Sequence, residues 1–402
     1  MALRILPKVL LAAAAVAACS RSRSTEPIEA GVVHSTAATI EASEVVSAEA
    51  ELAQPSIDAG AVRPLVGVAT PGQTIEIPAA TFASGSTPGD EGRVASVEPA
   101  LVPVKLGAYA IDALPYPNDP AAAPALVASQ EEAARLCADR GARLCTELEW
   151  EHACKGPNDE PFSTGPRWNV ECDTAPSRCA SGFGVRALGF LREWTDSKLA
   201  TATESPVVRG GASSAHRCAA RAGGALRSTE RESMAFRCCH GDRNDATVPA
   251  IGTLPAFRRT TLEAADLAKI LAEVPELTRI SDKVRLFSDD DVKTILGRSS
   301  SDGNGISFAT SPLLWSPGPG VELLVATGRA KKTGFVVALH VLPNGKYRFA
   351  SSFLLLNEAA PVALAYEPSR RKELRWTTCW NCAGEQGEVS VRDEGRIVIV
   401  QY

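Results

Sequence analysis

Long apolar runs, histidine and excess charge are all scarce in this 402-residue sequence. Its apolar run from Val9 to Ala18 has ten residues, whereas a transmembrane helix needs about 20, so we expect no membrane-spanning helix. The five histidines are scattered, which argues against a histidine-cluster metal centre. A net charge of −5 gives no electrostatic reason to expect nucleic acid as a partner. We therefore expect the chain beyond its first residues to be soluble.

The N-terminus has the pattern of an export signal. Arg4 and Lys8 provide its positive start, and residues 1–18 end in small residues. Val16-Ala17-Ala18-Cys19 resembles the lipobox of bacterial lipoproteins, in which the cysteine is lipidated and becomes the first residue of the mature chain. Several acyl chains, such as palmitate, give stable anchoring where one chain would be marginal. The resemblance implies a lipid anchor on Cys19, and Ser20 implies an outer-membrane lipoprotein on its periplasmic or surface face. The alternative is an ordinary secretory signal that happens to precede a cysteine.

Cysteine usage indicates an oxidising compartment. Of 11 cysteines, eight lie between Cys137 and Cys239, and two form the Cys379-Trp380-Asn381-Cys382 motif. An even set in an exported protein is typical of disulfides. A zinc site would need paired CxxC spacings or nearby histidines, and the eight central cysteines have neither.

The length exceeds what one hydrophobic core usually serves, so we expect two folded domains. Residues 19–69 are rich in Ala, Ser, Glu and Thr and predict a flexible tether, because they bury too little apolar surface to offset chain entropy. Residues 70–243 predict a loop-rich domain that holds most of the cysteines. In it, a capping box at Ser129–Glu132 predicts one helix, and Thr146 with Glu149 predicts a second.

Residues 255–402 predict a small antiparallel β domain with a helical lead-in. A capping box at Thr260–Glu263 predicts a helix that Pro275 ends, and Ser288 predicts the start of a shorter one. Pro343-Asn344-Gly345 predicts a hairpin turn. Apolar and β-branched runs predict the strands, at 321–327, 334–342, 346–356, 361–366, 388–392 and 396–401. The fold class expected for the whole chain is α+β.

Six segments of the central domain together form a recognisable series of motifs. Ile77-Pro78-Ala79-Ala80-Thr81-Phe82-Ala83-Ser84-Gly85-Ser86 is similar to IPGGxFxMGS, and Arg143-Leu144-Cys145-Thr146-Glu147-Leu148-Glu149-Trp150-Glu151-His152-Ala153-Cys154 is similar to RLPTEAEWEYAC. The remaining four are Arg192-Glu193-Trp194-Thr195-Asp196, Val208-Arg209-Gly210-Gly211-Ala212, Arg217-Cys218-Ala219-Ala220-Arg221 and Phe236-Arg237-Cys238. In content and order they resemble the motifs of formylglycine-generating enzymes, the sulfatase-modifying factor family. The resemblance implies a compact α+β domain related to C-type lectins.

The resemblance also implies disulfide pairings. Carried over by motif, two family disulfides become Cys137–Cys238 and Cys154–Cys218. The cysteines left beside them are expected to form a third, Cys145–Cys239. Cys172 and Cys179 are seven residues apart and are expected to close a local loop as a fourth. The Cys379 and Cys382 pair is expected to be a structural disulfide, with a redox pair or a metal site as the alternatives.

The catalytic part of the family pattern is missing. The enzymes of the family carry two further cysteines between the GGS motif and RCAAR, which bind copper and react with the substrate thiol. Here that stretch is Ala212-Ser213-Ser214-Ala215-His216-Arg217, which is several residues shorter and contains no cysteine. Copper(I) needs thiolate ligands, which serine does not provide. We therefore expect no catalytic residues, and no oxidation of sulfatase cysteines.

The family's calcium site is also altered. The family's GNxWEW loop binds calcium through its Asn and Glu, and here Phe190 replaces the Asn while Glu193 is kept. Glu193 is thus a candidate ligand of a structural calcium, with a buried Glu–Arg ion pair as the alternative. His216 lies where the active cleft is expected and is a weaker candidate for a base or ligand. His152 is expected in the core and His240 on the surface.

Two classes of function remain open. The first is a non-catalytic envelope module that binds a protein or a glycan, or is simply a structural part of an envelope complex. The second is a divergent oxidative enzyme like the iron-dependent sulfoxide synthases of this superfamily, which need a histidine cluster. The scattered histidines favour the first class.

Overall fold

The computed structural model of the chain describes residues 61–199, 205–211, 216–223, 234–296, 307–309, 312–355, 361–379, 385–392 and 395–402. The predicted signal peptide (residues 1–18), the predicted lipidation site Cys19, residues 20–60, the Ala212–Ala215 segment and Cys382 lie outside these ranges. No helix within the ranges combines the length and the apolar character needed to cross a bilayer. The described fold is α+β, with many short strands and few helices.

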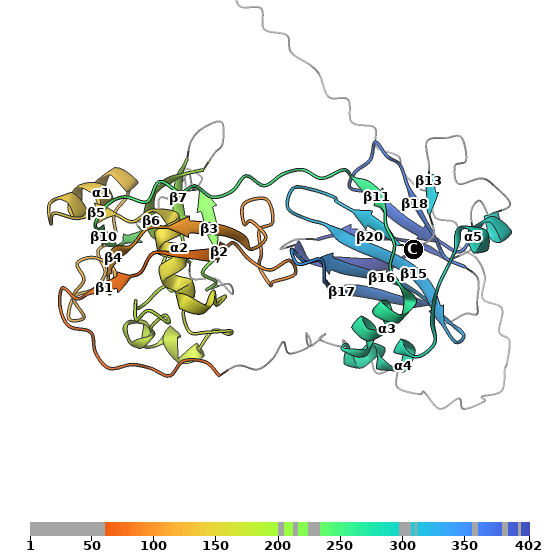
Figure 1. Cartoon of the computed structure of the whole chain (residues 1–402), viewed down its shortest axis with the longest axis horizontal. Helices are drawn as coiled ribbons and strands as arrows, with labels where there is room; N and C mark the ends of the chain where they lie inside the picture. The colour runs from red at the N-terminus through yellow and green to blue at the C-terminus, as the bar shows by residue number, and fades with distance from the viewer. Residues whose placement is uncertain are drawn as a thin grey trace, which may run out of the picture. The chain divides into compact units, whose positions relative to one another are not determined.

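The N-terminal part of the described chain contains small sheets joined by long loops (Figure 1). One sheet has the strand order β1-β4-β10-β5, another the order β8-β7-β6-β9, and β2 pairs only with β3. All pairs are antiparallel except the parallel pair of β6 and β9. The bounds are β1 (Thr74–Ile77), β2 (Ala80–Ser84), β3 (Val102–Leu106), β4 (Tyr109–Asp112), β5 (Arg143–Leu144), β6 (Glu193–Lys198), β7 (Pro206–Arg209), β8 (Arg221–Gly223), β9 (Ala235–Phe236) and β10 (Cys238–His240).

Two helices accompany these sheets, and both begin where the sequence predicts. Helix α2 (Glu147–Lys155) has a complete capping box, because the Thr146 side chain accepts from the Glu149 amide and the Glu149 side chain accepts from the Thr146 amide. Helix α1 (Gln130–Ala138) has half of one: the Ser129 hydroxyl accepts from the amide of Glu132. Every residue of α2 is buried, so this helix lies in the centre of the domain.

Four disulfides hold this loop-rich part together. The structure pairs Cys137–Cys238, Cys145–Cys239, Cys154–Cys218 and Cys172–Cys179. These are the four pairings expected from the sequence. The double cysteine in β10 joins two core clusters, because Cys238 packs with Phe236 and Trp194 while Cys239 packs with Leu148. Disulfides of this number indicate that the protein folds in an oxidising environment outside the cytoplasm.

The segment 61–69, expected at the end of the flexible tether, belongs to the folded part. The Arg63 amide donates to the Thr164 carbonyl at 2.8 Å, and the Val66 amide donates to the Arg178 carbonyl at 2.8 Å. The Arg63 side chain pairs with Glu160. Composition predicted a tether up to residue 69, but backbone hydrogen bonds to the 160–178 loops order the last nine residues of that range.

The C-terminal part is antiparallel throughout its described strands (Figure 1). One sheet has the order β11-β14-β15-β16-β17, with β12 also paired to β15, and the other has the order β13-β18-β19-β20-β21. The bounds are β11 (Phe257–Arg259), β12 (Val284–Leu286), β13 (Ser307–Ala309), β14 (Leu313–Trp315), β15 (Leu323–Ala330), β16 (Thr333–Val341), β17 (Tyr347–Leu355), β18 (Ala363–Tyr366), β19 (Leu374–Thr377), β20 (Gln386–Val391) and β21 (Ile397–Gln401).

The first of these sheets is buried on both faces. Leu323 and Val325 of β15 pack with Trp376 and other residues of the second sheet, whereas the alternate residues Leu324 and Ala326 pack under the helices. Alternate residues of a strand point to opposite faces, which explains why this strand is apolar almost throughout. The layers are therefore helices, sheet and sheet.

Of the two helices predicted in this part, the first begins differently from the prediction and the second begins as predicted. Helix α3 spans Ala264–Ala272, and its N-cap residue Glu263 makes no capping bond through its side chain, so the predicted box at Thr260 is wrong. Pro275 opens a 3-10 turn, η4 (Pro275–Leu277), before α4 (Thr278–Ser281). Helix α5 (Asp289–Leu296) does follow Ser288, whose hydroxyl accepts from the Asp291 amide.

Candidate functional site

The charged residues of the family-like motifs converge on helix α2. On one side of the helix, Arg143 donates two hydrogen bonds to the Glu149 carboxylate, at 2.7 Å and 2.8 Å. Asn244 adds a third at 2.8 Å. Burial by itself would raise the pKa of the Glu149 carboxyl, but the bonds from Arg143 and Asn244 hold that pKa below its usual value. The ionised Glu149 carboxylate therefore binds Arg143 and Asn244 and at the same time accepts from the Thr146 amide at the start of the helix.

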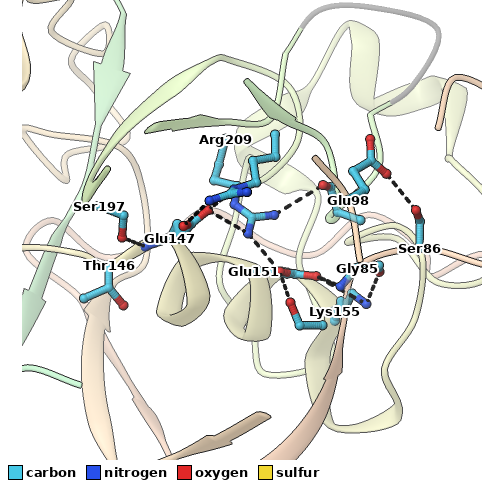
Figure 2. A network of polar contacts seen from close by, with 12 residues as sticks. Gly85, Ser86, Glu98, Thr146, Glu147, Glu151, Lys155, Ser197 and Arg209 are labelled. Carbon is cyan, nitrogen blue, oxygen red and sulfur yellow. Dashed lines mark hydrogen bonds and ion pairs between the residues drawn. The ribbon is translucent and has the colours of Figure 1, made fainter. Parts of the chain in front are cut away.

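On the opposite side, two carboxylates of α2 share one arginine. Arg209, at the end of β7, lies above Glu147 and Glu151 and pairs with them at 3.1 Å and 2.9 Å (Figure 2). The i and i+4 spacing puts both carboxylates on one face of the helix, so a single guanidinium reaches both. Arg221 of β8 adds two hydrogen bonds to Glu147, at 2.5 Å and 2.8 Å. The helix is thereby joined to the β8-β7-β6-β9 sheet.

Lys155 and Glu151 anchor the loop that follows β2. The Glu151 carboxylate accepts from the Gly85 amide at 2.6 Å and from the Ser84 hydroxyl at 3.0 Å (Figure 2). Lys155 donates to the Gly85 carbonyl at 2.6 Å. Burial would raise the pKa of Glu151, but the charges of Arg209 and Lys155 lower it. The Ser84-Gly85-Ser86 part of the first motif is thus a docking point for α2.

Another buried ion pair lies beside this loop. The Arg217 guanidinium donates to the Glu98 carboxylate at 2.6 Å and 3.0 Å. The Ser86 hydroxyl donates to the same carboxylate at 2.7 Å (Figure 2). Glu98 belongs to no motif in the sequence, and it neutralises the arginine that begins the RCAAR-like segment.

Glu193, the candidate calcium ligand, forms the ion pair that was its alternative role. Its two carboxylate oxygens accept from Arg237 at 2.6 Å and 2.7 Å, and the Trp150 indole N–H donates to it at 2.9 Å. The Glu193 and Arg237 side chains are fully buried. Within the described ranges, no group of three or more Asp, Glu, His or Cys side chains comes together as a metal site would require.

The arrangement of these charges fits structural support better than chemistry. A catalytic carboxylate needs a free oxygen within reach of a substrate, whereas these carboxylates each bind internal donors and lie 5% exposed or less. A buried ion pair leaves an uncompensated charge when one partner is removed, at a cost of about 3–5 kcal/mol. The network therefore fixes the path of the loops around α2.

His152 lies in the core, as the sequence predicts, but it is not fully satisfied. Its ring stacks on Phe82 with centroids 4.9 Å apart and meets the Phe183 ring edge-on at 5.1 Å. Its Nδ1 atom is buried without a hydrogen-bond partner. Burial lowers the pKa of the imidazole, despite the opposing charges of Asp159 and Glu151.

His240, expected on the surface, is only partly exposed there. Its side chain is 32% exposed, and its Nε2 atom lies 3.2 Å from the carboxylate of the fully buried Asp112. The cause is its place in β10, which pairs with β4 so that His240 stands opposite Ala110. The sequence did not predict a strand at Cys238-Cys239-His240, so the partial burial of His240 was not expected.

His216 lies on a surface cluster with Trp168 and Asp173. Its ring stacks on the Trp168 indole with centroids 4.0 Å apart and an interplanar angle of 10°. Its Nδ1 atom lies 3.1 Å from the Gly189 carbonyl oxygen, and its Nε2 atom 3.7 Å from the Asp173 carboxylate. The Trp168 N–H donates to the same carboxylate oxygen at 3.0 Å. The sequence did not single out Trp168 and Asp173, because neither belongs to a motif. The nearby Cys172 and Cys179, expected to close a local loop, were the signal that could have drawn attention to them.

Cys379 is disulfide-bonded. Its expected partner Cys382 lies outside the described residues, so the structure does not place the CxxC motif as a unit. The Cys379 carbonyl accepts from the Thr377 hydroxyl at 2.5 Å, at the end of β19. A disulfide-bonded Cys379 agrees with the structural reading of this motif.

Comparison with known proteins adds no assignment. No family model matches the chain, and no curated protein matches it either. The resemblance to formylglycine-generating enzymes therefore rests on the motifs quoted above.

Proposed function

We propose that this chain is an exported, lipid-anchored protein of the cell envelope whose central domain is a non-catalytic member of the formylglycine-generating-enzyme family. The domain binds a protein or a glycan of the envelope and does not oxidise one. The anchor is Cys19, and the residues between it and Ala61 connect the membrane to the folded part.

The observation that carries this proposal is the use of the central cysteines. Residues 70–243 contain eight cysteines, and all eight are paired in the four disulfides. The thiolate is the form of cysteine that attacks a substrate or binds copper, and a disulfide sulfur does neither. The domain therefore has the family's framework without the two thiols that give the family its chemistry.

The ion pairs formed by the charged residues of the motifs also support a non-catalytic role. The three glutamates of the RLPTEAEWEYAC-like motif form ion pairs, and so do four arginines of the later motifs, Arg209, Arg217, Arg221 and Arg237. Such pairs keep a loop-rich domain in one conformation, and variable loops on a fixed framework are a common way to build a binding surface.

The catalytic half of the proposal is tested with a peptide that carries the sulfatase cysteine motif. The purified mature chain is incubated with the peptide, copper and a reductant, and aldehyde formation is followed by mass spectrometry. We expect no conversion above the rate without protein. Turnover that increases with protein concentration would contradict the proposal.

The anchor is tested by fractionating cells that express the full chain or its Cys19→Ser variant. We expect the full chain in the membrane fraction with an acyl mass on its N-terminal residue, and the variant in the soluble fraction. A membrane-bound Cys19→Ser variant would show that another part of the chain holds it there.

A further inference from the structure

The Trp168 cluster has the features of a ligand site. Trp168 is half-buried, and its indole is held in one orientation by two contacts, the ring of His216 against one face and the carboxylate of Asp173 at its N–H. The Asp173 carboxylate is 53% exposed, so it keeps acceptor capacity toward solvent beside the ring. A partly exposed indole and an exposed acceptor thus lie side by side.

The loop that carries the cluster is unusually constrained for a surface segment. Two 3-10 turns, η2 (Val170–Asp173) and η3 (Pro176–Arg178), are joined by the Cys172–Cys179 disulfide. The other three disulfides close separations of 64 to 101 residues, and this one closes 7. A short loop loses little chain entropy on closure, so this disulfide contributes less to global stability than the others. Its main consequence is local order around Asp173.

The segments around Arg63 and Gly189 also hold this loop. The Asn169 side-chain amide donates to the Arg63 carbonyl at 3.2 Å. Within the loop, the Asn169 carbonyl accepts from the Cys172 amide at 3.0 Å. Gly189 brings the His216 backbone close, because a Cβ at Gly189 would lie 2.5 Å from the His216 carbonyl oxygen. The orientation of Trp168 is therefore set before any ligand arrives, which lowers the entropy cost of binding.

We propose that Trp168 and Asp173 bind a pyranose unit of an envelope glycan, with His216 as the positioning residue behind the indole. This inference rests on the proposed binding function and names its ligand class. An indole offers a large, rigid and amphipathic surface against which the C–H face of a sugar ring packs. A carboxylate beside it accepts hydrogen bonds from the ring hydroxyls.

A sugar fits this site better than a protein does. Protein interfaces of stable complexes bury on the order of 800 Å² on each partner around apolar anchors. On this loop, Val170 is the exposed large apolar side chain, at 73%. Other exposed apolar side chains of the N-terminal part, such as Val94 and Leu126, lie on different loops and do not extend this surface. One aromatic plane with one carboxylate matches the size of a single sugar ring.

The test uses the full mature chain in detergent and three probes. A tetrasaccharide of β-1,4-linked N-acetylglucosamine is titrated by calorimetry, isolated peptidoglycan sacculi are used in a sedimentation assay, and core oligosaccharide of lipopolysaccharide is titrated as the alternative glycan source. We expect binding to at least one probe. Trp168→Ala should weaken it at least tenfold, and Asp173→Asn severalfold. Trp168→Phe, which keeps a ring, should retain more affinity than Trp168→Ala.

Tyr402→Ala is the matched control, because Tyr402 is an exposed aromatic residue, at 69%, near the end of the last strand. It should leave glycan binding unchanged. Near-ultraviolet circular dichroism and thermal unfolding confirm that each variant is folded. Failure of the parent chain to bind any probe at millimolar concentration would overturn the inference, as would unchanged affinity of Trp168→Ala. Trp168-dependent binding to an envelope protein without glycan binding would overturn it too, while leaving the proposed anchored, non-catalytic function intact.

Discussion

The Glu193 carboxylate accepts two hydrogen bonds from the Arg237 guanidinium, at 2.6 Å and 2.7 Å, and neither side chain is exposed. This pair joins the parallel strands β6 and β9 to the start of β10, because Glu193 opens β6 and Arg237 stands between β9 and β10. The Trp150 indole from α2 binds the same carboxylate. One ion pair thus connects four elements of the central domain, β6, β9, β10 and α2.

Glu193→Gln should therefore destabilise the protein severely. The substitution keeps the shape and leaves the Arg237 charge buried without a counterion, which costs about 3–5 kcal/mol. Urea unfolding of the soluble Cys19→Ser form, monitored by tryptophan fluorescence, measures the change. The matched control is Asp139→Asn, which breaks the exposed pair of Arg135 and Asp139 and should cost at most about 0.5 kcal/mol. Similar effects of the two variants would contradict the structural role assigned to Glu193.

The disulfides should differ in what they contribute to global stability. In the chain-entropy account, the Cys137–Cys238 bond, with a separation of 101, contributes about 4.7 kcal/mol, and the Cys172–Cys179 bond, with a separation of 7, about 2.5 kcal/mol. Replacing each pair by alanines and measuring the free energy of unfolding tests this order. We expect the Cys172/Cys179 variant to remain folded and to lose glycan binding. A larger loss of stability in that variant than in the Cys137/Cys238 variant would contradict the order.

Acid should destabilise the protein in two steps. The pKa values of His152 and His340 are lowered from 6.5, in each case first by burial, and that of His340 reaches about 4. The folded state therefore binds a proton at each of these imidazoles less readily than the unfolded state does. The stability that the two neutral histidines allow is complete above pH 6.5 and is lost as the pH falls below 6.5. Glu149 has a lowered pKa, so its contribution is present above the ordinary value of 4.5 and is lost as the pH falls through the folded value.

His152→Phe separates the two steps. It removes one of the histidine protons taken up on unfolding, so the free energy of unfolding should depend less steeply on pH below 6.5, whereas the loss of the Glu149 contribution below pH 4.5 should remain. Chemical unfolding at a series of pH values measures both slopes. An unchanged slope below pH 6.5 would mean that His152 titrates alike in both states.

Gly189→Ala should disturb the Trp168 cluster. Gly189 has a φ of +82°, and its Cβ would lie 2.5 Å from the His216 carbonyl oxygen. Gly141 is the control, because its φ is +70° and a Cβ there meets nothing within 4 Å. Both substitutions incur the left-handed backbone penalty of about 1 kcal/mol, and only Gly189→Ala adds a clash worth about 1–3 kcal/mol. Thermal unfolding should show a clearly larger decrease for Gly189→Ala; equal decreases would show that the His216 segment moves away without cost.

Local signals predicted the elements that depend on neighbours in sequence. The complete capping box of α2 is such a case, since Thr146 and Glu149 satisfy each other across one turn. The predicted box at Thr260 does not form, because α3 begins only at Ala264. Leu262, Leu267 and Leu271 all pack against the core under the sheet, so tertiary packing and not a side-chain cap positions this segment. Short strands such as β11, β12 and β19 were missed because three or four residues carry too little pattern.

The candidate sites show the same limit. The motif resemblance located Glu193 and two of the disulfides, Cys137–Cys238 and Cys154–Cys218, because family motifs record long-range contacts that one sequence does not reveal. The other two pairs followed from the cysteines left over and from the short spacing of Cys172 and Cys179. The partners that lie outside motifs were not found. Glu98 is 119 positions from Arg217, and Trp168 is 48 from His216, so no spacing rule connects them.

The central proposal is that the domain keeps the framework of the family it resembles and lacks that family's reactive thiols. The most direct test is a free-thiol count, with metal analysis, on mature protein purified from an oxidising compartment. With Cys19 blocked by lipid, we expect no free thiol in the denatured chain and no stoichiometric copper or iron. Two reactive thiols in the central domain, or one equivalent of either metal, would contradict the account.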